Sequence, residues 1–145
     1  MDIGRLTEYI IKNEGSITKK GRHMPYVDTV GKTTIGYGRN LTDNGISDVE
    51  ARYLLANDIQ SAINDLRAAL PWFDSLDEVR QEVLVDLSFN MGISGLLKFK
   101  RTLDHIKNGE YPQAAAELLD SLYAEQTGHR ALRNSLALES GSFQR

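Results

Sequence analysis

The chain of 145 residues contains no cysteine, and this absence excludes disulfide bonds, thiol catalysis and cysteine-ligated zinc. Histidine is scarce, and His23, His105 and His129 stand at none of the spacings typical of metal ligands, so we expect no metal site. Long apolar runs are missing too, which excludes a membrane span of about 20 residues. The segment from Met1 to Arg5 lacks the basic and then apolar pattern of a signal peptide. We therefore expect a protein without a membrane anchor that stays in the cytoplasm where it is made.

The charge balance is slightly acidic, with a formal net charge of −3. This sign argues against a general nucleic-acid-binding protein, which would present a basic surface. A hydrophobic content of 41% is sufficient for a core, and a charged content of 26% argues against disorder. The length fits one compact unit or two small lobes.

Apolar periodicity predicts a helix at the start of the chain, followed by a β region. Ile3, Leu6 and Ile10 share one face of a helix over residues 2–13, and Gly15 supplies its end. Residues 26–38 are rich in Thr, Val, Tyr and Ile, which favours a β-hairpin with its turn at residues 31–32.

The rest of the chain is predicted to be helical. Residues 47–50 and 75–78 have the pattern of capping boxes, and they begin a long helix over about 47–70 and a central buried helix that Gly92 ends. Shorter helices are expected near residues 94–99, 102–107, 112–123 and 128–140. One β region among helices predicts an α+β fold.

Two carboxylates on either side of the first loop have the chemistry of a glycosidase. Glu14 lies in the last turn of the first helix, where the negative end of the helix dipole, together with any burial, raises a carboxyl pKa as a general acid requires. Asp28 is flanked by threonine hydroxyls that favour its ionised form. One protonated and one ionised carboxyl group are the minimum equipment for cleaving a glycosidic bond. Taken alone, Glu14 also fits a solvated helix end and Asp28 a turn residue.

The arrangement of motifs resembles that of the T-even phage lysozyme family, the phage endolysins. The family carries a Glu, then an Asp, then five residues and a Thr leading into Ile-Gly-x-Gly, and here these are Glu14, Asp28 and residues 34–38. Three further blocks follow in the family's order, at residues 73–80, 89–92 and 126–130. The resemblance therefore covers nearly the whole chain.

The resemblance implies a role for each residue of the motif. Glu14 would protonate the glycosidic oxygen, Asp28 would activate a water and Thr34 would position that water. The family inverts the anomeric configuration, which needs carboxyl groups roughly 6.5–9.5 Å apart. No cofactor is implied.

The resemblance also implies residues that contact the substrate. They are Asn40, Phe89, Thr102, Glu117 and Arg130. Asn40 and Glu117 depart from the family, which has Leu and Asn at these positions, and Phe89 fits a core position equally well.

Two ion pairs follow from the same alignment. Arg39 and Asp58 would pair in the small lobe, and Arg130 would face Glu14.

The implied architecture is a single lysozyme-like domain over residues 1–145. A small lobe of about 15–55 carries a short antiparallel sheet, a connecting helix spans about 47–70, and a helical lobe of about 71–145 includes the helix at 2–13. The substrate would lie in the cleft between the lobes. The loop between Glu14 and Asp28 is longer than usual in the family, and its basic residues 19–23 are interpreted as a surface insertion.

The implied function is that of a muramidase, which hydrolyses the β-1,4 bond between N-acetylmuramic acid and N-acetylglucosamine in peptidoglycan. Its role would be lysis of a bacterial host by a monomeric, antimicrobial enzyme, released from the host cytoplasm by a separate holin-type pore. Three alternatives remain open. A lytic transglycosylase would cleave the same bond without water, a catalytically silent module would only bind the wall, and a membrane-disrupting protein would act through residues 128–140.

Overall fold

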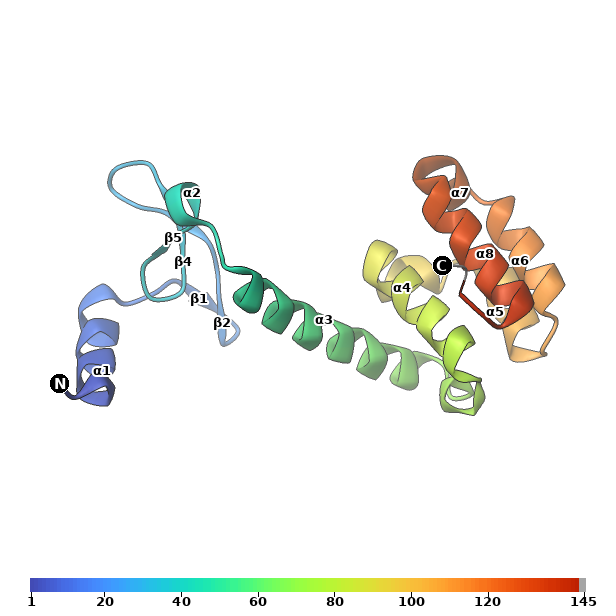
Figure 1. The fold of residues 1–145 in the computed structure, drawn as a ribbon, viewed down its shortest axis with the longest axis horizontal. Coiled ribbons are helices and arrows are strands. Elements are labelled where there is room, and N and C mark those ends of the chain that lie inside the picture. Colours follow the sequence, from blue (N-terminus) through green and yellow to red (C-terminus); the bar gives the residue numbers. More distant parts are fainter. Residues whose placement is uncertain (144–145) are drawn as a thin grey trace. The chain divides into compact units, whose positions relative to one another are not determined.

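The computed structural model describes residues 1–143, which belong to two compact units (Figure 1). Unit 1 is Met1–Tyr53 and unit 2 is Leu54–Arg145. The long helix α3 (Asp48–Ala69) contributes residues to both units. The assignment of residues 2–13 to the helical lobe stays a prediction.

Unit 1 begins with helix α1 (Ile3–Glu14), within one residue of the predicted bounds. Asp2 starts the helix, because its side chain accepts a hydrogen bond of 2.9 Å from the backbone N–H of Arg5. Gly15 ends it with a φ of 62° and donates its N–H to the carbonyl of Ile11.

Two small antiparallel sheets follow α1. The strands are β1 (Thr18–Lys19) and β2 (Arg22–His23) in the first sheet, and β3 (Tyr26–Val27), β4 (Thr33–Ile35) and β5 (Arg39–Asn40) in the second. Strand β4 is central, and its residue Thr34 pairs with Tyr26 on one side and Asn40 on the other. The predicted β region is thus confirmed. Residues 19–23, interpreted as a surface insertion, are exposed and belong to the hairpin of β1 and β2.

The segment after the sheet leads into α3. The short helix α2 (Leu41–Asn44) packs against β4 and β5. The predicted capping box at residues 47–50 is confirmed, because Ser47 Oγ accepts from the N–H of Glu50 and Glu50 Oε1 accepts from the N–H of Ser47.

Unit 2 is helical around one core. Its remaining elements are η1 (Phe73–Ser75), α4 (Glu78–Leu96), α5 (Lys100–Lys107), α6 (Tyr111–Leu119), α7 (Leu122–Thr127) and α8 (His129–Ser140). Helix α8 packs against α4, α6 and α7, and α6 also packs against α5. The apolar stripe predicted for α4 is confirmed, since Val83, Leu84 and Leu87 are fully buried.

Three details of unit 2 differ from the sequence expectations. Asp77, rather than Ser75, caps α4, because the helix begins at Glu78 and Ser75 is the last residue of η1. The helix expected over 112–123 is divided between α6 and α7, because Ser121 caps a new helix through the N–H of Ala124. Helix α4 continues past Gly92, but this glycine has the non-helical angles φ 76° and ψ 160°, so the expected interruption is present.

The side chain of Arg80 joins the start of α4 to the end of α8. Its guanidinium donates to the carbonyls of Leu138 and Glu139 and lies 3.7 Å from the ring centre of Tyr111. These carbonyls belong to the last turn of α8, where a positive charge also opposes the helix dipole. Arg80 thus caps α8 from another helix.

These elements give the α+β class that the sequence predicted. Within residues 1–143, no helix combines the length and the apolar character needed to cross a membrane.

Candidate active site

Glu14 is the last residue of α1 and is exposed in unit 1. The sequence suggested two effects that favour the protonated form of this carboxyl group, the helix dipole and burial. Unit 1 does not provide the burial. Its carboxylate lies against the turn between β4 and β5. A Cβ atom on Gly38 would be 3.3 Å from Glu14 Oε2 and 3.4 Å from its carboxyl carbon.

The close approach explains why glycine occupies position 38. Gly38 has a φ of 95°, which L-residues with a side chain rarely adopt, and a side chain there would press on the Glu14 carboxylate. Gly36, two residues earlier, has a φ of 65°. The Gly-x-Gly motif therefore builds a turn that brings backbone beside Glu14.

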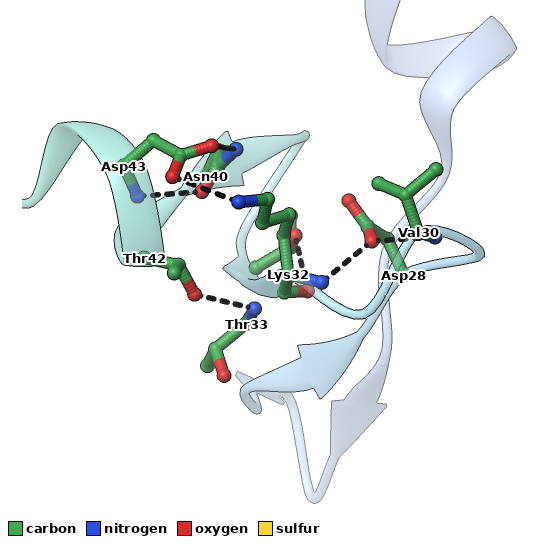
Figure 2. Close-up of polar contacts among 8 residues, drawn as sticks. Asp28, Val30, Lys32, Thr33, Asn40, Thr42 and Asp43 are labelled. Carbon is green, nitrogen blue, oxygen red and sulfur yellow. Dashed lines mark hydrogen bonds and ion pairs between the residues drawn. The ribbon is translucent and has the colours of Figure 1, made fainter.

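Asp28 is half-buried and held by the backbone of its own turn (Figure 2). Its Oδ1 accepts from the N–H groups of Val30 at 3.0 Å and Lys32 at 2.8 Å. The backbone N–H of Asp28 donates in return to the carbonyl of Lys32 at 2.9 Å. The turn therefore fixes one carboxylate oxygen and leaves Oδ2 without a hydrogen bond from any residue the structure describes.

Thr34 lies on the central strand β4 with a relative exposure of 5%. Its hydroxyl donates to the carbonyl of Lys32 at a long 3.3 Å. The carbonyl of Lys32 therefore accepts hydrogen bonds from both the N–H of Asp28 and the hydroxyl of Thr34. Asp28 and Thr34 are thus connected through Lys32. Glu14, Asp28 and Thr34 all belong to unit 1.

A polar network supports the turn from the side of α2 (Figure 2). The ammonium of Lys32 pairs with Asp43 at 3.1 Å, and the Thr42 hydroxyl accepts from the N–H of Thr33 at 2.8 Å. The side-chain NH₂ of Asn40 donates to the carboxylate of Asp43. Its side-chain oxygen accepts from the backbone N–H of Asp43 and so caps α2. The amide of Asn40, predicted to contact substrate, is therefore engaged within unit 1.

The predicted ion pair between Arg39 and Asp58 is wrong, because Arg39 pairs with Glu50. Two guanidinium nitrogens donate to the two oxygens of Glu50, at 2.8 and 2.6 Å. Hydrogen bonds from Arg39 and then from Ser47 lower the pKa of Glu50 to about 2. Glu50 thus links the end of the sheet to the start of α3.

Two of the predicted substrate-contact residues line one hollow of about 400 Å³ in unit 2. They are Phe89, which is 46% exposed, and Arg130. The other lining residues are mostly aliphatic: Leu55, Ile59, Ile63, Glu82, Val85 and Asp86. An aliphatic lining offers few hydrogen bonds to a sugar.

Arg130 is held by Asp86, which the sequence analysis did not identify. Nε and one terminal nitrogen of Arg130 donate to the two Asp86 oxygens at 2.9 and 2.7 Å, and Asn134 donates to Asp86 at 2.8 Å. Partial burial opposes ionisation of Asp86, but the hydrogen bonds from Arg130 and Asn134 outweigh it and lower its pKa. The predicted approach of Arg130 to Glu14 stays a prediction.

The other two predicted contact residues lie elsewhere in unit 2. Thr102, in the first turn of α5, is 3% exposed. Glu117 lies on α6 and lines a separate surface hollow with His105 and Gln113. Neither lies in the hollow of Phe89 and Arg130. Among the described residues, no group of three or more His, Cys, Asp or Glu side chains is arranged to hold a metal ion.

Comparison with known proteins places these motifs in context. The sequence profile described as Phage lysozyme matches residues 18–136, a range that includes Asp28 and Thr34 and begins after Glu14. Probable T4-type lysozyme 2 of Dictyostelium discoideum is 29% identical over 147 residues, covering 81% of this chain and 86% of that protein. Probable T4-type lysozyme 1 of the same organism is 30% identical over 71 residues, 49% of this chain and 42% of that protein. The pre-baseplate central spike protein Gp5 of Enterobacteria phage T4 is 29% identical over 112 residues, which are 74% of this chain and 20% of that protein.

Proposed function

We propose that this chain, which belongs to the phage lysozyme family and is a lysozyme-like peptidoglycan hydrolase, cleaves the β-1,4 bond between N-acetylmuramic acid and N-acetylglucosamine. Glu14 is the proton donor to the leaving oxygen. Asp28 takes a proton from the attacking water, and Thr34 orients that water. The reaction inverts the anomeric carbon, because the water attacks from the face opposite the leaving group.

The observation that best supports these roles is the local geometry of Asp28. Two backbone N–H groups hold Oδ1, so the orientation of the carboxylate does not depend on mobile side chains. Oδ2 remains available to accept a proton from water. The Thr34 hydroxyl and the backbone N–H of Asp28 both donate to the carbonyl of Lys32, which supports a joint role for the two residues.

Glu14 and Gly38 support the other half of the proposal. The Glu14 carboxylate lies where a side chain on Gly38 would contact it, and the carboxyl group remains exposed. A carboxyl group that is both positioned and accessible can donate its proton to a bound glycan. This chemistry requires only the two carboxyl groups, a hydroxyl and water, and no cofactor.

Clearing of bacteria stripped of their outer membrane tests the proposal. Glu14→Gln should lower the clearing rate by about 10²–10⁴-fold, since this is the usual contribution of general acid catalysis. Glu8→Gln, an exposed glutamate on the same helix, is the matched control and should clear normally. Near-normal clearing by Glu14→Gln, in a protein with unchanged helical content, would remove Glu14 from the mechanism.

Analysis of the products tests the reaction type. Hydrolysis yields a reducing sugar at the new end, whereas a transglycosylase yields an anhydro sugar without one. Proton NMR, which identifies the anomer that is released first, tests inversion. A retained configuration would exclude direct attack by water activated at Asp28.

For the biological role, we propose lysis of a bacterial host by a monomer that stays in the host cytoplasm until a holin-type pore releases it. Expression in a bacterium with and without such a pore protein tests this role. Lysis should require both proteins, and light scattering should give the mass of one chain, 16.2 kDa.

A further inference from the structure

The hairpin of β1 and β2 carries a cluster of positive charges in a segment of the chain that contains no acidic residue. Lys19, Lys20 and Arg22 lie within four consecutive positions, and residues 15–27 contain no Asp or Glu. All three cations are exposed. None of them takes part in an ion pair with the residues that the structure describes. Their charge is therefore available to a partner outside the chain.

The hairpin is a formed element with a tight two-residue turn. Lys20 and Gly21 have φ values of 52° and 76°, and positive φ at both central residues is the pattern of hairpin turns that match the twist of the strands. Beyond the two paired positions, the N–H of Met24 donates to the carbonyl of Ile17 at 2.8 Å. The cations are thus presented on an ordered support.

The register places two of these cations directly opposite each other. Lys19 pairs with Arg22 across the strands, and like charges at opposed positions destabilise a hairpin. A local arrangement that costs stability often marks a functional surface. An anionic partner would remove the repulsion by placing negative charge beside both side chains.

The hairpin also contacts the turn that reaches the candidate proton donor. The ring of His23 meets the ring of Tyr37 edge to face, with centroids 4.9 Å apart and an angle of 75° between the planes. Tyr37 lies between Gly36 and Gly38, and Gly38 adjoins Glu14. The hairpin that carries the cations therefore adjoins, through its His23 face, the turn that reaches Glu14.

We propose that the β1–β2 hairpin binds the carboxylates of the peptide stems of peptidoglycan. The inference rests on the proposed function for the identity of the polymer. The stems branch from the muramic acid residues of the glycan strand that would be cleaved, so their carboxylates accompany the substrate into the site. A guanidinium can bind a carboxylate through two parallel hydrogen bonds, and each lysine adds a point charge.

Sedimentation with purified sacculi measures this binding separately from catalysis. All proteins carry Glu14→Gln so that the polymer is not consumed. The test variant combines Lys19→Gln, Lys20→Asn and Arg22→Gln, with Asn at position 20 because it tolerates positive φ. The control variant combines Lys100→Gln, Arg101→Gln and Lys107→Gln, which removes three exposed cations of α5 and changes the net charge equally.

At low salt, the hairpin variant should bind sacculi free of phosphate polymers about tenfold more weakly than the parent, whereas the control should change less than about twofold. A tenfold loss corresponds to about 1.4 kcal/mol, a modest share from each of three exposed ion pairs. High salt should remove the difference by screening. Sacculi whose carboxylates have been converted to amides should bind the parent and the hairpin variant equally.

Equal losses in both triple variants would overturn the inference, because net charge alone would then explain binding. So would a difference that persists on amidated sacculi, or one that arises only when phosphate polymers are present. The single change Arg22→Gln, with an expected loss of about twofold, repeats the test if the triple variant does not fold. Near-normal wall clearing by Glu14→Gln alone would instead contradict the proposed function, whereas the binding comparison at 4 °C, where little polymer is consumed, would still decide this inference.

Discussion

At the scale of single residues, two glycine substitutions distinguish the effect of crowding Glu14 from the effect of backbone strain. Gly38→Ala adds a Cβ at positive φ and 3.3 Å from the Glu14 carboxylate. Gly45→Ala also adds a Cβ at positive φ, 57°, but with nothing within 4 Å. Both variants should lose about 1–3 kcal/mol of stability. Only Gly38→Ala should also clear walls more slowly per folded molecule, and equal specific activities would contradict the positioning role.

Glu50 predicts a pH dependence of stability. Its pKa is lowered from 4.5 to about 2 in the folded protein by hydrogen bonds, first from Arg39 and then from Ser47. A carboxyl group with a lowered folded-state pKa stabilises the protein above its unfolded pKa, and this contribution is lost as the pH falls from about 4.5 to about 2.

Urea unfolding at pH 6, 4 and 2.5 measures this effect. The difference in midpoint between the parent and Glu50→Gln should be largest at pH 6 and should shrink toward pH 2.5. Because Glu50 is 42% exposed, added salt should reduce the difference as well. A difference that does not depend on pH would show that the pair with Arg39 contributes no pH-linked stability.

The sequence indicated candidate residues that lie in one local pattern, and it missed contacts between residues far apart in the chain. Asp28 and Thr34 could be selected because both belong to one local pattern, an Asp and, after five residues, a Thr that leads into Ile-Gly-x-Gly. The partnership of Asp86 with Arg130 links residues 44 positions apart, so no local spacing indicates it. The family alignment suggested Asp58 as the partner of Arg39, whereas the fold brings Glu50 to the guanidinium.

At the scale of secondary structure elements, Arg80 should matter more than an exposed arginine. Arg80→Lys removes donors to the last carbonyls of α8 and the contact with Tyr111, because an ammonium lacks the planar guanidinium geometry. The expected loss is about 1.5–3 kcal/mol, typical of hydrogen bonds to a charged group. Arg67→Lys, in an exposed pair with Asp74, should lose less than about 1 kcal/mol. Chemical unfolding compares the two, and equal losses would contradict the capping role.

Element boundaries were predictable where one cap had no competitor. Ser47 begins α3 as expected because its hydroxyl is available to Glu50. The same pattern at residues 75–78 gave the wrong cap, since Ser75 belongs to η1 and Asp77 directly precedes the first residue of α4. The break at Ser121 was missed because the residues on both sides favour helix, and the side-chain hydrogen bond that starts α7 competes only locally.

At the scale of the whole molecule, burial is distributed unevenly. Every fully or nearly buried hydrophobic residue of the described structure lies between Ala62 and Leu138. In the described part of unit 1, Thr34 alone is buried. Because apolar burial is the main favourable term in folding, unit 2 should be stable without the first 46 residues.

A fragment of residues 47–145 tests this expectation, since it keeps the cap of α3. It should unfold cooperatively with heat when followed by circular dichroism at 222 nm. Residues 1–46 alone should show no cooperative transition. A gradual loss of signal in the larger fragment would show that unit 2 depends on unit 1 for its stability.

The bond from Arg80 to the carbonyl of Leu138 has a consequence for synthesis of the chain. These residues are 58 positions apart, and a ribosome adding about 5–20 residues per second needs roughly 3–12 s to make that stretch. During this interval Val83, Leu84 and Leu87 of α4 have been made, but α8, which packs against α4, has not. The emerging chain therefore exposes an apolar helix face for seconds, which is long enough for chaperones and proteases to find it before its last helix exists.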